Sequence, residues 1–98
     1  LVVDMASFEI MKSFGVEAIH DATHCVQRPG GQGKISGGNR DFIEPLAKAA
    51  IAAGASGLFM EIHPSPSEAL SDSATQWPME KTKELLEKLI RIKEACDA

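Results

Sequence analysis

Three side chains in this sequence combine residue types and positions that suit metal-dependent chemistry. His24 follows a short stretch of strand character, Glu61 lies near the end of a second such stretch, and Asp72 belongs to the polar loop that comes next. One imidazole and two carboxylates form a mixed nitrogen and oxygen ligand set, which suits Zn, Fe or Mn. No short ligand motif surrounds them, so ordinary roles stay open. In that alternative interpretation, Glu61 and Asp72 are helix-capping or solvent-facing acids, and His24 is a hydrogen-bonded loop residue.

Two further residues near His24 are expected to play no part in chemistry. His20 lies four residues earlier, and along a strand the two rings would be about 13 Å apart. We therefore expect His20 to be an interior histidine with its hydrogen bonds satisfied. Cys25 has no second cysteine nearby, and we expect an unreactive thiol.

The polar segment from residue 25 to residue 39 is rich in glycine. Three cationic residues lie within or beside it: Arg28, Lys34 and Arg40. Backbone N–H groups and positive charge suggest phosphate binding, but the pattern matches neither standard fingerprint. Ser36 stands where a dinucleotide site requires glycine, and Ile35 stands where a P-loop requires serine or threonine. We therefore expect a flexible lid, mobile in the absence of substrate.

Regular elements must position these residues, and the hydrophobic spacing predicts three strand–helix units. The predicted strands are residues 1–5, 17–23 and 57–62, and the predicted helices are residues 7–14, 41–53 and 79–95. Gly15 and Gly54 are natural stops for the first two helices. The third strand is apolar on both faces, which is typical of a parallel strand covered on both sides. Parallel strands all end on one face of a barrel, so His24, Glu61 and Asp72 are expected to converge there.

The alternation of strands and helices predicts an α/β fold with a parallel sheet and right-handed crossovers. Three strands alone would leave two open edges, and a complete (β/α)8 barrel needs about 250 residues. The 98 residues therefore suit the last part of a barrel or of an open sheet. Because the chain opens on the β-branched run at residues 1–3, we expect it to be the C-terminal piece of a longer protein.

Charge and composition exclude some classes of protein. The net charge of −4 argues against nucleic acid as a partner, because a basic face would be required. No apolar run approaches the roughly 20 residues that span a bilayer, and no signal peptide is visible. The two cysteines are far apart in the sequence. Free thiols are therefore expected, which points to the cytoplasm.

Several long motifs resemble the 3-deoxy-D-manno-octulosonate 8-phosphate synthase family. Residues 21–24 (Asp-Ala-Thr-His), Gln27, 29–33 (Pro-Gly-Gly-Gln-Gly) and 36–40 (Ser-Gly-Gly-x-Arg) are similar to its seventh strand and the following loop. Residues 57–66 resemble its eighth strand, 69–72 the start of its last loop, and 1–5 its sixth strand. The resemblance implies the last three β/α units of a (β/α)8 TIM barrel. Residues 1–98 would be the C-terminal portion of one barrel domain.

The resemblance also implies a transferase activity. The family condenses phosphoenolpyruvate with D-arabinose 5-phosphate and water, releasing phosphate and making a precursor of lipopolysaccharide. In its metal-dependent branch, His24, Glu61 and Asp72 correspond to ligands of a divalent metal such as Zn, Fe or Mn. A fourth ligand, a cysteine on the first strand, would lie outside this chain, and metal-independent members have asparagine there. The branch therefore stays open.

The resemblance further assigns roles to individual residues. His24 and Asp72 are candidates for proton transfer during catalysis. Substrate contacts are expected from the covering loop: Gln27, Arg28, Ser36 and Arg40. No organic cofactor is implied, and the expected assembly is a cytoplasmic homo-oligomer, a tetramer by resemblance. Two departures are Ser73, where the family usually has glycine, and His20, where it more often has a large apolar residue.

Two alternatives stay open. The related synthase that makes 3-deoxy-D-arabino-heptulosonate 7-phosphate shares Glu-x-His-Pro at 61–64 and Leu-Ser-Asp at 70–72. It usually has serine before the histidine of strand seven and a shorter loop, so Thr23 and the long 29–38 segment favour the octulosonate enzyme. The other alternative is a non-catalytic fragment that only packs with a partner. The 98-residue piece alone is expected to be inactive.

Overall fold

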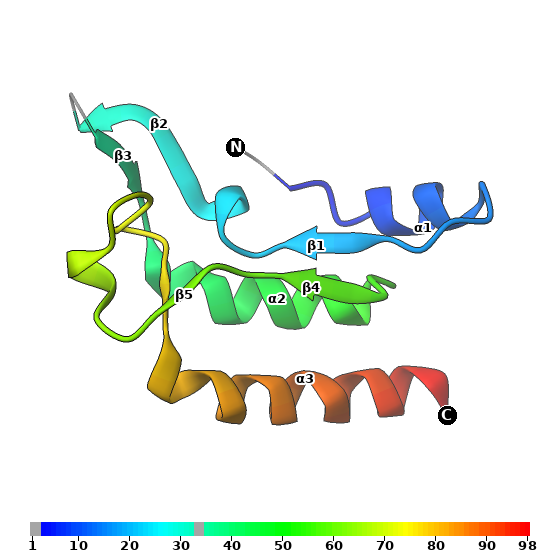
Figure 1. Ribbon diagram of the computed structural model, residues 1–98. Helices are drawn as coiled ribbons and strands as arrows, with labels where there is room; N and C mark the ends of the chain where they lie inside the picture. The colour runs from blue at the N-terminus through cyan, green and yellow to red at the C-terminus, as the bar shows by residue number, and fades with distance from the viewer. Residues whose placement is uncertain (1–2, 33–34) are drawn as a thin grey trace.

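The centre of the structure is a parallel β–α–β unit (Figure 1). The computed structural model describes residues 3–32 and 35–98, and for residues 28–38 only the backbone is considered. Strand β1 (Ile19–Asp21) pairs in parallel with strand β4 (Gly57–Phe59), with Ile19 opposite Gly57 and Asp21 opposite Phe59. Helix α2 (Ile43–Ala52) lies between them in the chain, so the predicted α/β class and parallel pairing are confirmed.

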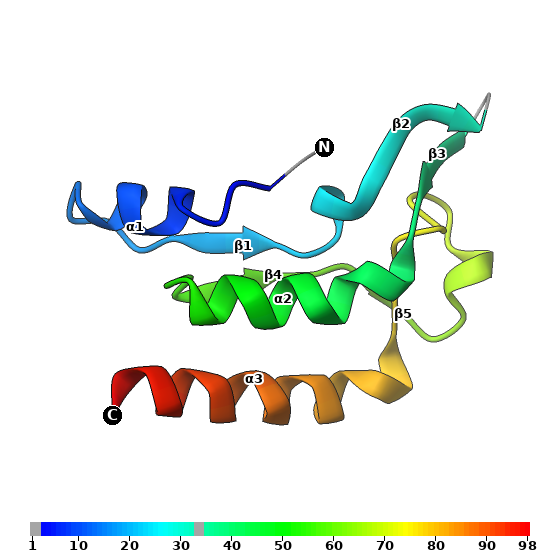
Figure 2. The same cartoon turned by 180° about the vertical axis from the view of Figure 1, so that it is seen from behind.

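Two helices form a layer beside this pair of strands. Helix α2 packs against helix α3 (Thr82–Asp97), and the two run side by side in the same direction (Figure 2). The two helices contribute buried apolar residues to the core: Ile43, Ala47, Ala50, Leu85 and Leu89. At the rim of the interface, Lys88 donates to Glu44 at 3.1 Å. Packing of amphipathic faces therefore joins the last helix to the parallel unit.

The first segment differs from its predicted form. Residues 1–2 lie outside the described residues, and residues 3–5 do not form a strand. A strand there would have to pair beside β1, and no such pairing occurs in the described part of the chain. Helix α1 (Ser7–Lys12) is shorter than expected and buries Phe8 against the ring of His20. Gly15 follows with a positive φ of 80°, as expected of a helix stop.

The predicted lid is largely a β-hairpin. Strand β2 (Gln27–Gln32) pairs antiparallel with strand β3 (Ile35–Gly38), so the described part of this segment has paired strands. Its mobility in the absence of substrate stays a prediction. The pairing is irregular between Arg28 and Gln32, where Pro29 has no backbone N–H to donate. Short 3-10 turns flank the hairpin, η1 (His24–Val26) before it and η2 (Arg40–Phe42) after it.

The second and third predicted strands are shorter than expected. The chain leaves β1 after Asp21 and turns into η1, so His24 begins a 3-10 turn instead of ending a strand. The apolar run at 57–62 breaks after Phe59, and β5 (Ile62–His63) pairs in parallel with β6 (Trp77–Pro78). Two more 3-10 turns follow, η3 (Pro66–Glu68) and η4 (Met79–Lys81). Hydrogen bonds to neighbouring segments, which hydrophobic spacing does not encode, decide these breaks.

Among the described residues, no helix has the length and apolar content needed to cross a membrane.

Two adjacent leucines in α3 test the helix layer. Leu85 is 1% exposed and Leu86 is 42% exposed. We expect Leu85→Ala in the intact protein to lower the free energy of unfolding by about 2–5 kcal/mol, because it leaves a cavity in the core. Leu86→Ala should cost no more than about 1 kcal/mol. Denaturant titration of both variants measures the difference, and equal losses would contradict this packing of α3.

Candidate metal centre

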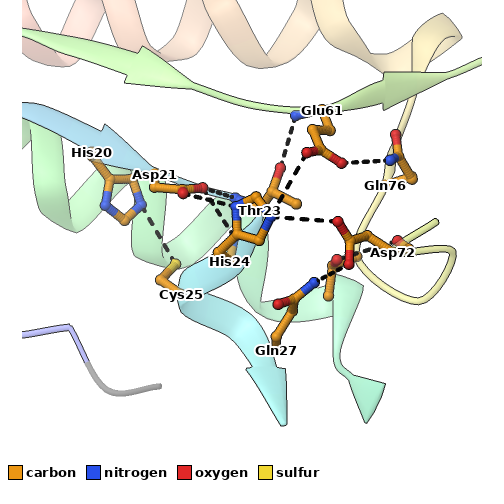
Figure 3. A network of polar contacts seen from close by, with 10 residues as sticks. His20, Asp21, Thr23, His24, Cys25, Gln27, Glu61, Asp72 and Gln76 are labelled. Atoms are coloured by element: carbon orange, nitrogen blue, oxygen red, sulfur yellow. Dashed lines mark hydrogen bonds and ion pairs between the residues drawn. The ribbon is translucent and has the colours of Figure 1, made fainter. Parts of the chain in front are cut away.

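The carboxyl ends of β1 and β4 bring two of the candidate residues together. The ladder between the strands continues one step further, because Ala22 N–H donates to the carbonyl of Phe59 at 2.8 Å. The buried Thr23 then accepts the backbone N–H of Glu61 on its hydroxyl at 2.7 Å. The chain after β1 is thus tied to the chain after β4, and both His24 and Glu61 emerge at this edge (Figure 3).

Asp21 orients the His24 ring. One carboxylate oxygen, Oδ1, accepts the backbone N–H groups of Thr23 and His24 at 3.0 Å each. The other, Oδ2, lies 2.8 Å from His24 Nδ1. With Nδ1 donating to Asp21, Nε2 is turned toward Glu61 and Asp72. A single carboxylate therefore begins the turn and orients the ring.

The same contacts shift the pKa values of both groups. The hydrogen bond that His24 Nδ1 donates to the Asp21 carboxylate raises the pKa of His24 above its ordinary value. Burial acts to raise the pKa of Asp21, but the N–H groups of His24 and Thr23 and the His24 ring outweigh burial and lower that pKa. Protonation of His24 thus stabilises the folded chain below the ordinary pKa of histidine. This stabilisation is lost as the pH rises through the raised value.

Glu61 is held from two sides. Its backbone N–H donates to Thr23, and its carbonyl accepts the N–H of Trp77 at 2.9 Å. Its side-chain Oε2 accepts a 2.7 Å hydrogen bond from Nε2 of Gln76, which is 7% exposed. Because one oxygen is occupied by Gln76, the other, Oε1, faces His24. The buried amide therefore selects which carboxylate oxygen is presented.

Asp72 reaches the same place from the segment after β5. Its φ of 50° lies in the left-handed region, which aspartate tolerates better than most residues. Its carbonyl accepts the N–H groups of Thr75 and Gln76, which closes a turn. Its Oδ1 accepts a 2.5 Å hydrogen bond from Nε2 of Gln27. Oδ2 is then directed at His24.

These three side chains converge as expected from the sequence. His24 Nε2 lies 3.4 Å from Asp72 Oδ2 and 3.7 Å from Glu61 Oε1. Among the described residues they form a group whose ligand atoms all lie within 4.8 Å of one another. Ligands about 2.1 Å from a tetrahedral ion are about 3.4 Å apart, so the spacing of one imidazole and two carboxylates fits a divalent metal. The side chains are between 22% and 33% exposed, which leaves the group accessible.

The four residues predicted to contact substrate lie on or beside the hairpin. Gln27 and Arg40 are at its two ends, and both contact the segment that carries Asp72. The side chains of Arg28 and Ser36 lie outside the described residues. Sequence reasoning did not assign roles to Asp21 or Gln76. The spacing of Asp21, three residues before His24 at the start of a turn, was a usable signal, whereas nothing local in the sequence identifies Gln76.

His20 is an interior residue, as predicted, but its hydrogen bonds are not all satisfied. It is 1% exposed, and among the described residues its Nδ1 has no hydrogen-bond partner. Burial lowers the pKa of His20, so the neutral ring is favoured. Cys25 Sγ lies 3.8 Å from His20 Nε2, and burial raises the pKa of this thiol, which agrees with low reactivity. The turn after β1 separates His20 from His24, Glu61 and Asp72, which together are called the acidic group below.

Comparison with known proteins connects this chain to two kinds of synthase. The profile of the DAHP synthetase I family matches residues 1–98. The chain is 55% identical over 97 residues to a 2-dehydro-3-deoxyphosphooctonate aldolase of Desulfotalea psychrophila, which covers 99% of the chain and 35% of that relative. It is 56% identical over 89 residues to proteins of the same name from Legionella pneumophila and Methylococcus capsulatus, which covers 91% of the chain. The resemblance found in the sequence is thereby confirmed.

The chain spans about a third of the length of these curated relatives. Solved structures of Thermotoga maritima proteins have the same local fold. One, a phospho-2-dehydro-3-deoxyheptonate aldolase (DAHP synthase), matches 96% of this chain and 25% of its own with a TM-score of 0.77 and 32% identity. A truncated form of 3-deoxy-D-arabino-heptulosonate 7-phosphate synthase matches 95% of this chain and 32% of its own, with a TM-score of 0.76 and 31% identity.

Removal of the Asp21 charge tests the orientation of His24. In chelator-treated protein, we expect Asp21→Asn to move the pKa of His24 downward, because the amide is a weaker partner for the protonated ring. In the wild type, the N–H groups of Thr23 and His24 and the His24 ring share the two Asp21 oxygens. Asparagine has only one side-chain oxygen, and its NH₂ group cannot accept a hydrogen bond from these donors. Proton NMR titration of the His24 ring measures the shift. Asp97→Asn, at the far end of α3, is a matched control that should leave the titration unchanged, and an unchanged curve in Asp21→Asn would contradict the assignment.

Proposed function

Because the chain belongs to the DAHP synthetase I family, we propose that it forms the C-terminal part of a 3-deoxy-D-manno-octulosonate 8-phosphate synthase. The enzyme would condense phosphoenolpyruvate with D-arabinose 5-phosphate and water, and release phosphate. The observation that carries the proposal is the convergence of His24, Glu61 and Asp72 beyond the ends of two parallel strands. The 53–56% identity to proteins named 2-dehydro-3-deoxyphosphooctonate aldolase supports this choice of substrates.

We further propose that residues 1–98 supply the last three β/α units of a (β/α)8 barrel. The parallel β1–α2–β4 unit and the side-by-side helices α2 and α3 are the arrangement that such a barrel repeats. In this fold the active site lies at the carboxyl ends of the strands, which is the edge where the acidic group lies. The homo-oligomeric state, a tetramer by resemblance, and the cytoplasmic location belong to the same proposal.

The acidic group is proposed to hold a divalent cation, such as Zn, Fe or Mn. Its donor set and spacing suit such an ion, and three carboxylates around one imidazole favour positive charge. When bound, the ion supplies a Lewis acid and a means of lowering the pKa of a water. His24, Glu61 and Asp72 would be its ligands, and Asp21 and Gln76 would orient two of them.

The condensation makes definite demands on these side chains. The C3 carbon of phosphoenolpyruvate bonds to the aldehyde carbon of the sugar, and the aldehyde oxygen takes a proton. Water adds at C2 and loses one proton; the C2–O bond to phosphate then breaks, and the C2 hydroxyl gives its remaining proton to the departing phosphate as the ketone forms. We assign the proton movements to Asp72 and, where no metal occupies its Nε2, to His24. The hairpin, with Gln27, Arg28 and Ser36, is proposed to cover the substrates and exclude bulk water.

Carbon counting separates the proposal from its nearest alternative. Phosphoenolpyruvate and a five-carbon aldose phosphate give an eight-carbon acid, whereas a four-carbon aldose phosphate gives the seven-carbon acid of the heptulosonate enzyme. The intact protein should consume arabinose 5-phosphate, release phosphate and form the eight-carbon product by mass spectrometry. Exclusive use of the four-carbon sugar would reassign the protein to the heptulosonate enzymes. No turnover with either sugar would favour the non-catalytic alternative.

Substitution of His20 and of His24 separates a role in the candidate site from a role in folding. His24→Ala in the intact protein should lower turnover by about 10²–10⁴-fold, because a proton carrier or ligand is lost, with little change in the melting temperature. His20→Ala should do the reverse, because His20 is buried against Phe8. Turnover and thermal melts of both variants decide the matter. Normal turnover by His24→Ala would exclude it from the site.

Metal removal gives an independent check. Treatment of the intact protein with a chelator should abolish turnover if the acidic group holds a required cation, and Zn²⁺ or Mn²⁺ should restore it. Glu61→Gln should weaken binding of the ion, whereas Glu80→Gln, an exposed residue of η4, should not. Full activity in chelator, with no bound metal by elemental analysis, would instead place the protein in the metal-independent branch.

A further inference from the structure

The segment from Ser71 to Gln76 carries two of the groups that build the proposed metal centre. Asp72 supplies a candidate ligand, and the Gln76 amide holds Glu61 at 2.7 Å. The segment contains neither helix nor strand, and Asp72 has a left-handed φ of 50°. Its internal bonds are short-range ones, from Thr75 and Gln76 to the carbonyl of Asp72 and from Gln76 to the carbonyl of Ser71. Such a segment needs partners from elsewhere to keep its geometry.

Arg40 is such a partner. Its guanidinium Nε donates to the carbonyl of Gln76 at 2.7 Å, and Nη2 donates to the carbonyl of Ser73 at 2.5 Å. Ser73 is the second residue of the turn that the Asp72 carbonyl closes, and Gln76 is its last. A planar fork of donors is suited to fixing two acceptors at once. Arg40 thus spans the turn whose two ends present Asp72 and Gln76.

The position of Arg40 in the chain connects this turn to the hairpin. Arg40 is the second residue after β3 and opens η2, which Asn39 caps through the N–H of Asp41. At the other end of the hairpin, Gln27 donates to Asp72 Oδ1. Asn39 N–H donates to the carbonyl of Val26 at 3.2 Å, which joins the two ends of the hairpin. Residues at both ends of the hairpin therefore donate hydrogen bonds to the 71–76 segment.

We infer that Arg40 is a positioning residue for the metal centre, acting through the 71–76 segment, and not a contact for substrate phosphate. The inference rests on the proposed function and assigns a different role to a residue that the sequence pattern predicted to bind substrate. The guanidinium faces two backbone carbonyls, which are neutral acceptors inside the structure. Loss of the fork would release Asp72 and the amide that selects the oxygen of Glu61.

Cobalt binding tests this role without reference to turnover. Co²⁺ alone is titrated into the chelator-treated intact protein and followed by its visible absorption. Arg40→Met should raise the Co²⁺ dissociation constant about 10- to 100-fold, the usual cost of losing an orienting partner. Arg91→Met, an exposed arginine on α3, removes the same charge and should bind Co²⁺ like the wild type. Circular dichroism and thermal melts verify that each variant is folded.

Arg40→Lys separates the two roles and also serves if Arg40→Met fails to fold. Lysine keeps the positive charge but lacks the fork. As a positioning residue, Arg40→Lys should still bind Co²⁺ weakly, while the KM values for both phosphorylated substrates at saturating metal change by less than about threefold. Wild-type Co²⁺ affinity in a folded Arg40 variant would overturn the inference, as would absence of Co²⁺ binding by the wild type. If the wild type binds Co²⁺ without turning over the two substrates, the proposed function fails and the ranking of Co²⁺ affinities still decides the role of Arg40.

Discussion

The parallel register of β1 and β4 is the constraint on which the site depends. Asp21 lies opposite Phe59, and the next bond of the ladder runs from Ala22 to the carbonyl of Phe59. Both chains therefore leave the sheet at the same edge, with His24 on one and Glu61 on the other. Slippage by one residue would turn the side chains of β4 to the opposite face and displace the chain that leads to Glu61, since side chains alternate along a strand. Helices α2 and α3 contribute by burying the apolar surface that holds this register.

At that edge the structure concentrates negative charge at an electrostatic cost. Two carboxylates with oxygens within 4.8 Å of each other would repel by roughly 3 kcal/mol or more at an effective dielectric constant of about 20. Neutral donors reduce the repulsion by binding one oxygen of each acid, Gln76 on Glu61 and Gln27 on Asp72. The other oxygens are turned toward His24. The cation proposed for this group would offset the repulsion between the acids that these hydrogen bonds orient toward one point.

The hairpin and the 71–76 segment form the second level of organisation. Both stretches of sequence are poor in apolar residues, and polar contacts connect them. Gln27 and Arg40 stand at the two ends of β2 and β3, and each donates to the segment that carries Asp72. A movement of the hairpin would therefore change the position of Asp72 and of the Gln76 amide that holds Glu61. The proposed cover would therefore be connected directly to the geometry of the candidate ligands.

The sequence alone determined those features that depend on neighbours along the chain. Hydrophobic spacing located α2 and α3, Gly15 and Gly54 marked stops with positive φ, and strand–helix alternation implied parallel pairing. The candidate ligands His24, Glu61 and Asp72 followed from their places after apolar stretches. Local periodicity carries this information because burial of one face repeats with the period of each element.

Only the tertiary structure decided which contacts end the strands and orient the ligands. Thr23 and Glu61 are 38 residues apart, and their bond ends β1 and interrupts the long apolar run after Phe59. The predicted lid became a hairpin because β2 and β3 satisfy each other's backbone groups, which glycine content does not reveal. Arg40 reaches Ser73 and Gln76 from more than thirty residues away. Hydrogen bonds between distant segments leave no periodic trace in a sequence, because each depends on a single pair of residues brought together by the packing of everything else.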